Sequence, residues 1–122
     1  MSKVIANKTI GVQITIEDHS PEVLNALKNA IARALSSIGE EAETFAKEVI
    51  IEEERVDTGR MLNSISHREG EDFTAIGTDV EYAIYQELGT SRGIKPAKFL
   101  TRAVTEHTER YKSLVKDSLE NA

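Results

Sequence analysis

The sequence from Ser20 to Glu54 reads SPEVLNALKNAIARALSSIGEEAETFAKEVIIEEE and determines the fold class. Ser20 offers a hydroxyl cap, and Pro21 loses no hydrogen bond at a first helical position, so a helix is expected to start here. Apolar residues then recur at steps of three and four: Leu24, Leu27, Ile31, Leu35, Ile38, Ala42, Phe45 and Val49. This stripe predicts one long amphipathic helix over residues 20–55.

Two features interrupt this helical pattern. Gly39 lowers helix stability by about 1 kcal/mol relative to alanine, and it is compatible with a tolerated weak spot, a closely packed neighbour or a hinge. Glu52, Glu53 and Glu54 stand at the C-terminal end, where the helix dipole disfavours negative charge. The acidic run therefore indicates either a solvated, frayed end or a partner that supplies positive charge.

The segment before the helix has a different period. Residues 1–8 are expected to form a flexible arm, and a strand is expected over residues 9–16. Its apolar residues alternate with small or polar ones: Ile10, Val12, Ile14 and Ile16. A period of two predicts one buried face. The stripe of the long helix could cover that face, although it could also pair two copies of the chain as a coiled coil in a dimeric adaptor.

A turn and a hairpin are predicted over residues 56–80. Residues 65–68 and 73–78 have strand-like patterns, and they flank Glu-Gly-Glu-Asp at 69–72. Two such runs around a short polar turn are typical of an antiparallel hairpin.

Two further helices complete the predicted fold. A short helix is expected over Tyr82–Leu88, within a helix-and-loop segment 82–95, with Gly89 as a left-handed cap. Pro96 is expected to open a C-terminal helix over residues 96–119. The fold class is therefore α+β in a single domain, residues 1–122. A small, mostly antiparallel sheet packs against one long N-terminal helix, and a short central helix and a C-terminal helix follow.

Composition excludes several classes of function. The 122 residues include no cysteine, so disulfides, thiol nucleophiles and cysteine metal ligands are impossible. The formal net charge of −6 argues against a protein that grips duplex DNA, but it suits a surface past which DNA slides. No apolar run could span a bilayer and the N-terminus resembles no secretion signal, so no membrane partner is expected.

The titratable residues form no clear catalytic signature. The chain has three histidines, His19, His67 and His107. They lie in three different predicted elements and share no metal-ligand spacing. Asp57, Asp79 and Glu81 could hold Mg²⁺ for phosphoryl hydrolysis, which is one alternative function. We expect no catalytic residue, no metal and no cofactor.

A polar loop between two glycines is the predicted contact region. Positive charge, glycine freedom and flanking aromatic residues coincide there, which favours a loop that becomes ordered against a partner. The predicted contact residues are Thr90, Ser91, Arg92, Gly93 and Lys95.

Three blocks of sequence carry a resemblance to a known family. They are VDTGRMLNSI (56–65), GTDVEYAIYQELGT (77–90) and KPAKFL (95–100). In this order and spacing they resemble the head–tail connector family of long-tailed bacteriophages and prophages, whose members are called tail-completion, neck or minor tail proteins. The chain departs from the family pattern at Lys98, where a second proline is usual, and at 101–103, where the family often has Arg-Pro-Ala.

The resemblance implies a non-enzymatic structural protein of the virion neck or tail, made in the host cytoplasm. It implies a ring, of six subunits, through which DNA passes without sequence-specific binding. Other connector and tail proteins would be its partners, and we expect the isolated chain to be largely monomeric. The family blocks supply the expected structural residues: Asp57, Thr58, Gly59, Tyr82, Tyr85, Glu87, Gly89, Pro96 and Phe99. The aromatic residues among them are expected to anchor the two flanking helices.

Overall fold

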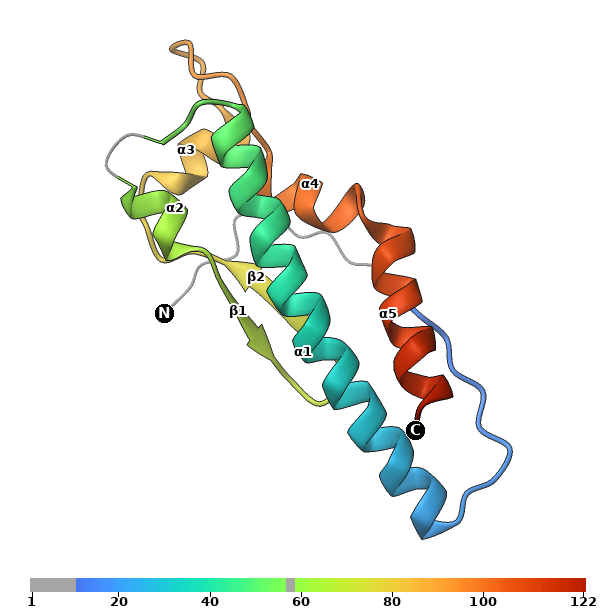
Figure 1. Cartoon of the computed structure of the whole chain (residues 1–122). Coiled ribbons are helices and arrows are strands. Elements are labelled where there is room, and N and C mark those ends of the chain that lie inside the picture. Colours follow the sequence, from blue (N-terminus) through green and yellow to red (C-terminus); the bar gives the residue numbers. More distant parts are fainter. Residues whose placement is uncertain (1–10, 57–58) are drawn as a thin grey trace.

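One long helix organises the molecule. The computed structural model describes residues 11–56 and 59–122, and its helix α1 (Pro21–Glu52) runs the length of the fold (Figure 1). A two-stranded antiparallel sheet, β1 (Ser66–Glu69) and β2 (Thr74–Gly77), packs against one side of α1. The predicted α+β class, with its small sheet on a long N-terminal helix, is confirmed.

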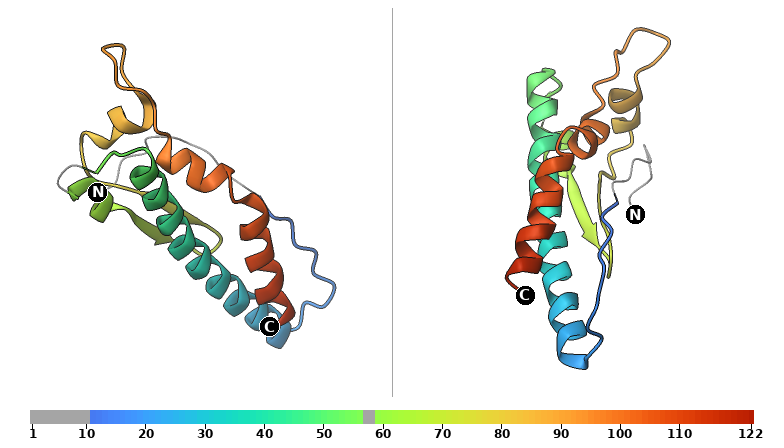
Figure 2. Two further views of the ribbon diagram at one scale, coloured as in Figure 1. Left: turned by 45° about the horizontal axis from the view of Figure 1, so that its top comes forward. Right: turned by 90° about the vertical axis from the view of Figure 1, so that its right-hand side faces the viewer.

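The remaining helices lie at the ends and on the other side of α1. Helices α4 (Phe99–Thr105) and α5 (Thr108–Glu120) pack against α1 opposite the hairpin (Figures 1 and 2). Two short helices, α2 (Arg60–Ser64) and α3 (Ala83–Leu88), lie near the C-terminal end of α1. Helix α2 contributes Met61 and α3 contributes Ala83 to the buried apolar cluster.

The N-terminus of α1 forms as its sequence predicts. The Ser20 hydroxyl accepts a hydrogen bond from the Val23 N–H at 3.3 Å, and Pro21 is the first helical residue. The helix runs unbroken through Gly39, which is buried. A Cβ at Gly39 would lie 2.3 Å from Cδ2 of His67 on β1. Of the three interpretations of Gly39, the structure supports close packing.

The core lies around the C-terminal half of α1. Phe99 and Ile50 are its largest fully buried apolar side chains. The buried cluster joins α1, α2, α3, α4 and the connections between them through Ala46, Val49, Ile50, Met61, Ile65, Val80, Ala83, Ala97, Phe99, Leu100 and Ala103. Phe99 therefore anchors its helix as expected.

The predicted C-terminal helix is two helices, with a break at Glu106–His107. The His107 ring stacks on Phe45 of α1 with centroids 3.5 Å apart, and Tyr111 packs nearby. The buried Tyr111 hydroxyl donates to the Ala103 carbonyl oxygen. Burial raises the pKa of Tyr111 to about 12, so this proton stays in place at neutral pH. These tertiary contacts explain the break, because no glycine or proline lies at this point of the sequence.

The predicted strand over residues 9–16 is wrong for its described part. Residues 11–16 have no strand structure, and β1 and β2 pair with each other. Residues 12–15 instead line an open groove of about 410 Å³ with Val115 and Leu119 of α5. Alternating apolar residues can be half-buried without strand pairing, because a helix can cover them as well as a sheet can.

Candidate functional site

The three family-like blocks pack together at one end of the molecule. Ser64 of the first block and Thr78 of the second place their hydroxyl oxygens 2.5 Å apart. The Ser64 hydroxyl donates to the Met61 carbonyl at 2.6 Å, so the Thr78 hydroxyl donates to Ser64 and accepts the Val80 N–H at 3.1 Å. These partly buried hydrogen bonds join α2 to the start of the second block.

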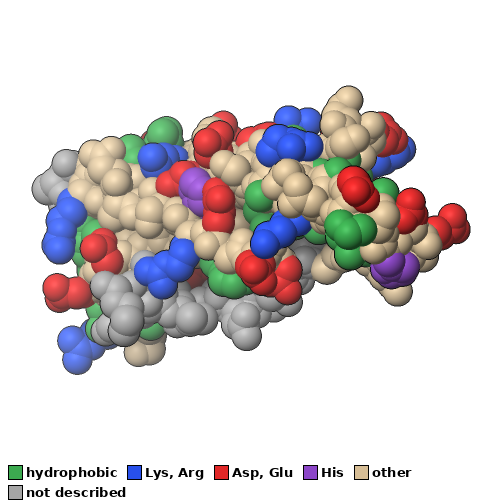
Figure 3. Space-filling view, turned by 90° about the horizontal axis from the view of Figure 1, so that it is seen from below, with side chains coloured by type: hydrophobic (Ala, Val, Ile, Leu, Met, Phe, Trp, Pro, Cys, Tyr) green, Lys and Arg blue, Asp and Glu red, His purple; other side chains and the backbone are tan. Residues whose placement is uncertain are grey.

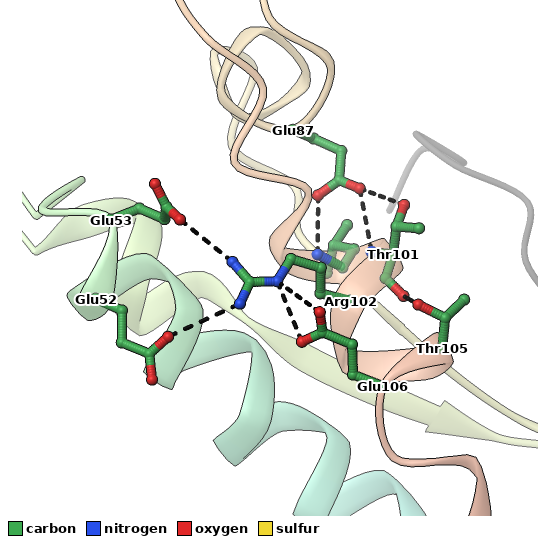
Figure 4. Close-up of polar contacts among 8 residues, drawn as sticks. Glu52, Glu53, Glu87, Thr101, Arg102, Thr105 and Glu106 are labelled. Carbon is green, nitrogen blue, oxygen red and sulfur yellow. Dashed lines mark hydrogen bonds and ion pairs between the residues drawn. The ribbon is translucent and has the colours of Figure 1, made fainter.

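Glu87 joins the second block to the third. Its side chain is fully buried in α3, yet it carries a carboxylate. The carboxylate accepts the backbone N–H groups of Leu100 and Thr101 at 2.8 and 3.1 Å, and the Thr101 hydroxyl at 2.6 Å (Figure 4). Two unpaired N–H donors at the first turn of α4 are thereby satisfied by a residue of another helix. Glu87 therefore caps the start of α4 from another helix.

Pro96 does not open the last helix, contrary to the sequence prediction. The helix begins at Phe99, and Lys98 precedes it with a left-handed backbone at φ 53° and ψ 40°. Residues 97 and 98 first pair with the end of α3, since the Ala97 N–H donates to the Gln86 carbonyl oxygen at 2.8 Å and the Lys98 N–H donates to the Glu87 carbonyl oxygen at 3.2 Å. The chain can turn into α4 only after this pairing, which places Leu100 within reach of Glu87.

The loop from residue 89 to 95 projects beyond α3 and the end of α1 (Figures 1 and 2). Its tip is closed by the Thr90 N–H donating to the Ile94 carbonyl at 2.9 Å, and by the Ile94 N–H donating to the Thr90 hydroxyl at 3.2 Å. Thr90 is thus half-buried and closes the loop. The other predicted contact residues, Ser91, Arg92, Gly93 and Lys95, are exposed.

Glycine is required at the entry to this loop. Gly89 has φ 76° and ψ 176°, so its φ is positive as predicted, but its ψ lies outside the left-handed helical region. A Cβ there would lie 2.8 Å from the Ile94 carbonyl oxygen. Gly59 has φ 84° at the start of α2. Gly59 and Gly89 therefore both provide a positive φ that other residues adopt only with strain.

Arg55 ties the base of the loop to α1. Its guanidinium donates to the Gln86 side chain at 2.6 Å and to the Lys95 carbonyl at 2.8 Å. The sequence analysis did not single out Arg55, because its partners lie 31 and 40 residues further along the chain.

The polarity of α3 is reversed relative to an ordinary surface helix. Its buried residues are Ala83 and Glu87, whereas Ile84, Tyr85 and Leu88 are 40%, 53% and 52% exposed. Since successive residues differ by about 100° around a helix, these three apolar side chains share one outward face. Tyr85 is not a core anchor, and Ile84 and Leu88 are surface residues that the sequence analysis missed.

Tyr82, by contrast, packs partly buried against the core. The Arg60 guanidinium lies over its ring, 5.7 Å from the centroid. This contact adds a second link between the first and second blocks.

The acidic end of α1 has a cationic partner within the chain. Arg102 of α4 lies 3.3 Å from Glu53 and 3.9 Å from Glu52, and it also contacts Glu106 at 3.1 Å (Figure 4). The run is a solvated end, since Glu52, Glu53 and Glu54 are all exposed, and it also has a source of positive charge in Arg102. Arg102 holds α4 against the end of α1.

His67 clamps the hairpin to α1. Nδ1 of its ring lies 2.9 Å from Glu43 of α1, and Nε2 lies 3.0 Å from Glu69. A neutral imidazole has one N–H, so both contacts are hydrogen bonds only when the ring is protonated. The hydrogen bond to Glu43, assisted by Glu69, raises the pKa of His67 above 6.5, although burial opposes this.

This clamp makes stability depend on pH. Because the pKa of His67 is raised in the folded state, protonation of its ring stabilises the folded protein. This contribution is present in full below the unfolded-state pKa of 6.5, and it is lost as pH rises through the folded-state pKa. We expect the free-energy difference between the wild type and His67→Gln to shrink by at most about 1 kcal/mol over that range. Urea denaturation of both proteins at pH 6 and 8.5 measures it. A difference independent of pH would contradict the clamp.

The described residues give no support for the alternative metal site. Asp57, like Thr58, lies outside the described residues, and Asp79 and Glu81 are exposed. Within residues 11–56 and 59–122, no group of three or more His, Asp or Glu side chains is placed to hold a metal ion. No helix in this part of the chain is long and apolar enough to cross a membrane.

Comparisons with known proteins add no relative. No protein-family model, curated protein or solved structure matches this chain.

Proposed function

We propose that this chain is a structural protein of the head–tail junction of a long-tailed phage or prophage, at the neck or as a tail-completion protein. The observation that carries the proposal is the convergence of its three family-like blocks on one structural unit. Glu87 joins two of them through three hydrogen bonds, and Ser64 and Thr78 join the other pair. Because the three blocks contact one another in the folded protein, their order and spacing in the sequence matter for folding.

The exposed surface of this unit supports an assembly role. The apolar face of α3 lies next to a projecting loop that carries Arg92 and Lys95. An apolar patch rimmed by polar residues marks an interaction site more often than a single exposed hydrophobe does. Subunits that form a ring around DNA need such surfaces on their sides.

Charge supports a ring that DNA traverses without binding. The net charge of −6 would repel phosphates from a ring lumen. Figure 3 shows acidic and basic side chains interspersed on one face, with apolar side chains between them. In this proposal the chain is not an enzyme, it is largely monomeric in dilute solution, and its connector and tail partners promote the ring, of six subunits, in the virion.

A null mutant in the phage or prophage that encodes the chain tests the proposal. We expect heads filled with DNA and finished tails to accumulate unjoined, because the joint lacks a component, and the plaque-forming titre to collapse. Electron microscopy of the lysate measures the first effect, and the wild-type gene supplied in trans is the control. Joined particles and normal titre in the null mutant would refute the proposal.

A further inference from the structure

A second exposed surface lies away from α3, at the turn of the hairpin. The hairpin tip, residues 69–73, carries the exposed acidic residues Glu69, Glu71 and Asp72 and ends in Phe73, which is 51% exposed. Figure 1 shows that the hairpin turn and α3 are separated along the length of the molecule. An exposed phenylalanine beside carboxylates is an unusual choice for a turn that only reverses the chain.

Phe73 is held in position. Its ring lies directly over Gly70, where a Cβ would come within 2.0 Å of the ring. The Gly70 N–H donates to the Phe73 carbonyl at 2.8 Å and closes the turn. Because the ring is already ordered, little conformational entropy is lost when a partner covers it.

The α3 surface has the opposite charge. It comprises the apolar face Ile84, Tyr85 and Leu88 together with the exposed cations Arg92 and Lys95 of the adjoining loop. Each surface therefore combines apolar area with charge, and the two charges have opposite signs.

We propose that the hairpin tip of one copy docks on the α3 surface of the next copy. Phe73 would pack among the apolar side chains of α3, and Glu71 and Asp72 would face Arg92 and Lys95. This contact rests on the proposed function and gives its ring an interface. Two different surfaces of one chain in contact make a head-to-tail arrangement, which closes into a ring when the rotation between subunits permits.

Charge also disfavours the two-fold pairings in which like surfaces meet. Two hairpin tips would bring carboxylates together, and two α3 surfaces would bring cations together, so each like pairing is disfavoured. The second copy is therefore the occupant whose chemistry both surfaces fit.

Two variants and their mixture test this contact. Phe73→Ala with Asp72→Lys removes the tip surface, and Tyr85→Ala with Arg92→Glu removes the α3 surface. All four side chains are exposed, so both variants should fold, as circular dichroism melts would verify. Sedimentation velocity from about 10 µM to about 1 mM should show the wild type self-associating with a dissociation constant on the order of 0.1 mM, since a small interface is expected to be weak.

We expect each variant to lose about tenfold or more of this affinity, as truncation of an interface aromatic does. An equimolar mixture should associate again and stop at a heterodimer, because each variant retains the surface that the other lacks. A third variant, Ile51→Ala with Lys28→Glu, changes exposed residues of α1 and should associate like the wild type.

Three outcomes would overturn the contact: a wild type that stays monomeric at about 1 mM, a variant that associates like the wild type, or a mixture that fails to pair. Phage genetics separates this inference from the proposed function. If the mixed variants pair but a null mutant still assembles normal particles, the contact is retained and the proposed function is refuted. If the mixed variants fail to pair but the null mutant leaves heads and tails unjoined, the proposed function is retained and the contact is refuted.

Discussion

Glu87→Ala is expected to lower the free energy of unfolding by about 3 kcal/mol. The substitution leaves the N–H groups of Leu100 and Thr101 without their acceptor at the first turn of α4. Each buried donor that loses its partner costs about 1–3 kcal/mol. Leu100 is itself buried, so solvent reaches that donor poorly. Urea denaturation followed by circular dichroism measures the loss.

Two companion substitutions separate the cap from a general effect of losing a carboxylate. Glu81→Ala removes an exposed acidic residue just before α3, the helix that carries Glu87, and should change the free energy of unfolding by no more than about 0.5 kcal/mol. Glu87→Gln keeps one acceptor oxygen and should fall between the wild type and Glu87→Ala. Equal stabilities for Glu81→Ala and Glu87→Ala would show that the cap contributes little.

Gly39→Ala is expected to destabilise the protein by about 1 kcal/mol, although alanine is the better helix former. Its methyl group would lie 2.3–2.8 Å from three atoms of the His67 ring. The ring is held by Glu43 and Glu69, so it can yield only by giving up those contacts. Overpacking of this kind typically costs about 1–3 kcal/mol, more than the roughly 1 kcal/mol that helix propensity returns.

A double-mutant cycle isolates the contact between Gly39 and His67. In a His67→Ala background the obstruction is gone, and Gly39→Ala should then stabilise the protein by about 0.5–1 kcal/mol. Ala32→Gly, at an exposed position of the same helix, calibrates the propensity term and should cost about 1 kcal/mol. The same sign for Gly39→Ala in both backgrounds would contradict the close packing.

Local signals were sufficient for much of the fold. The cap at Ser20 and Pro21 and the apolar stripe predict α1 to within a few residues, since both signals lie in the helix itself. The hairpin follows in the same way from two short runs around a polar turn. Each of these elements is specified by residues close in sequence, and so it could be predicted without knowledge of the tertiary structure.

The candidate site could be predicted only in part. Ser91, Arg92 and Lys95 are exposed on the loop and their contact with a partner stays a prediction, but the apolar face of α3 was missed. A charged residue ordinarily faces solvent, whereas Glu87 faces inward because α4 offers it backbone donors 13 and 14 residues later. The break before α5 and the anchoring by Arg55 likewise depend on partners distant in sequence.

The reversed polarity of α3 has a consequence for how this protein can evolve. The inward side of α3 is secured by a small alanine and by a carboxylate that binds backbone groups, not by shape-matched side chains. Ile84, Tyr85 and Leu88 can therefore vary with little penalty to folding. A lineage could retune this face as its neighbours diverge while Ala83 and Glu87 stay constant. If the proposed contact forms, recognition and foldability, which share residues in many small domains, lie on opposite sides of a single six-residue helix.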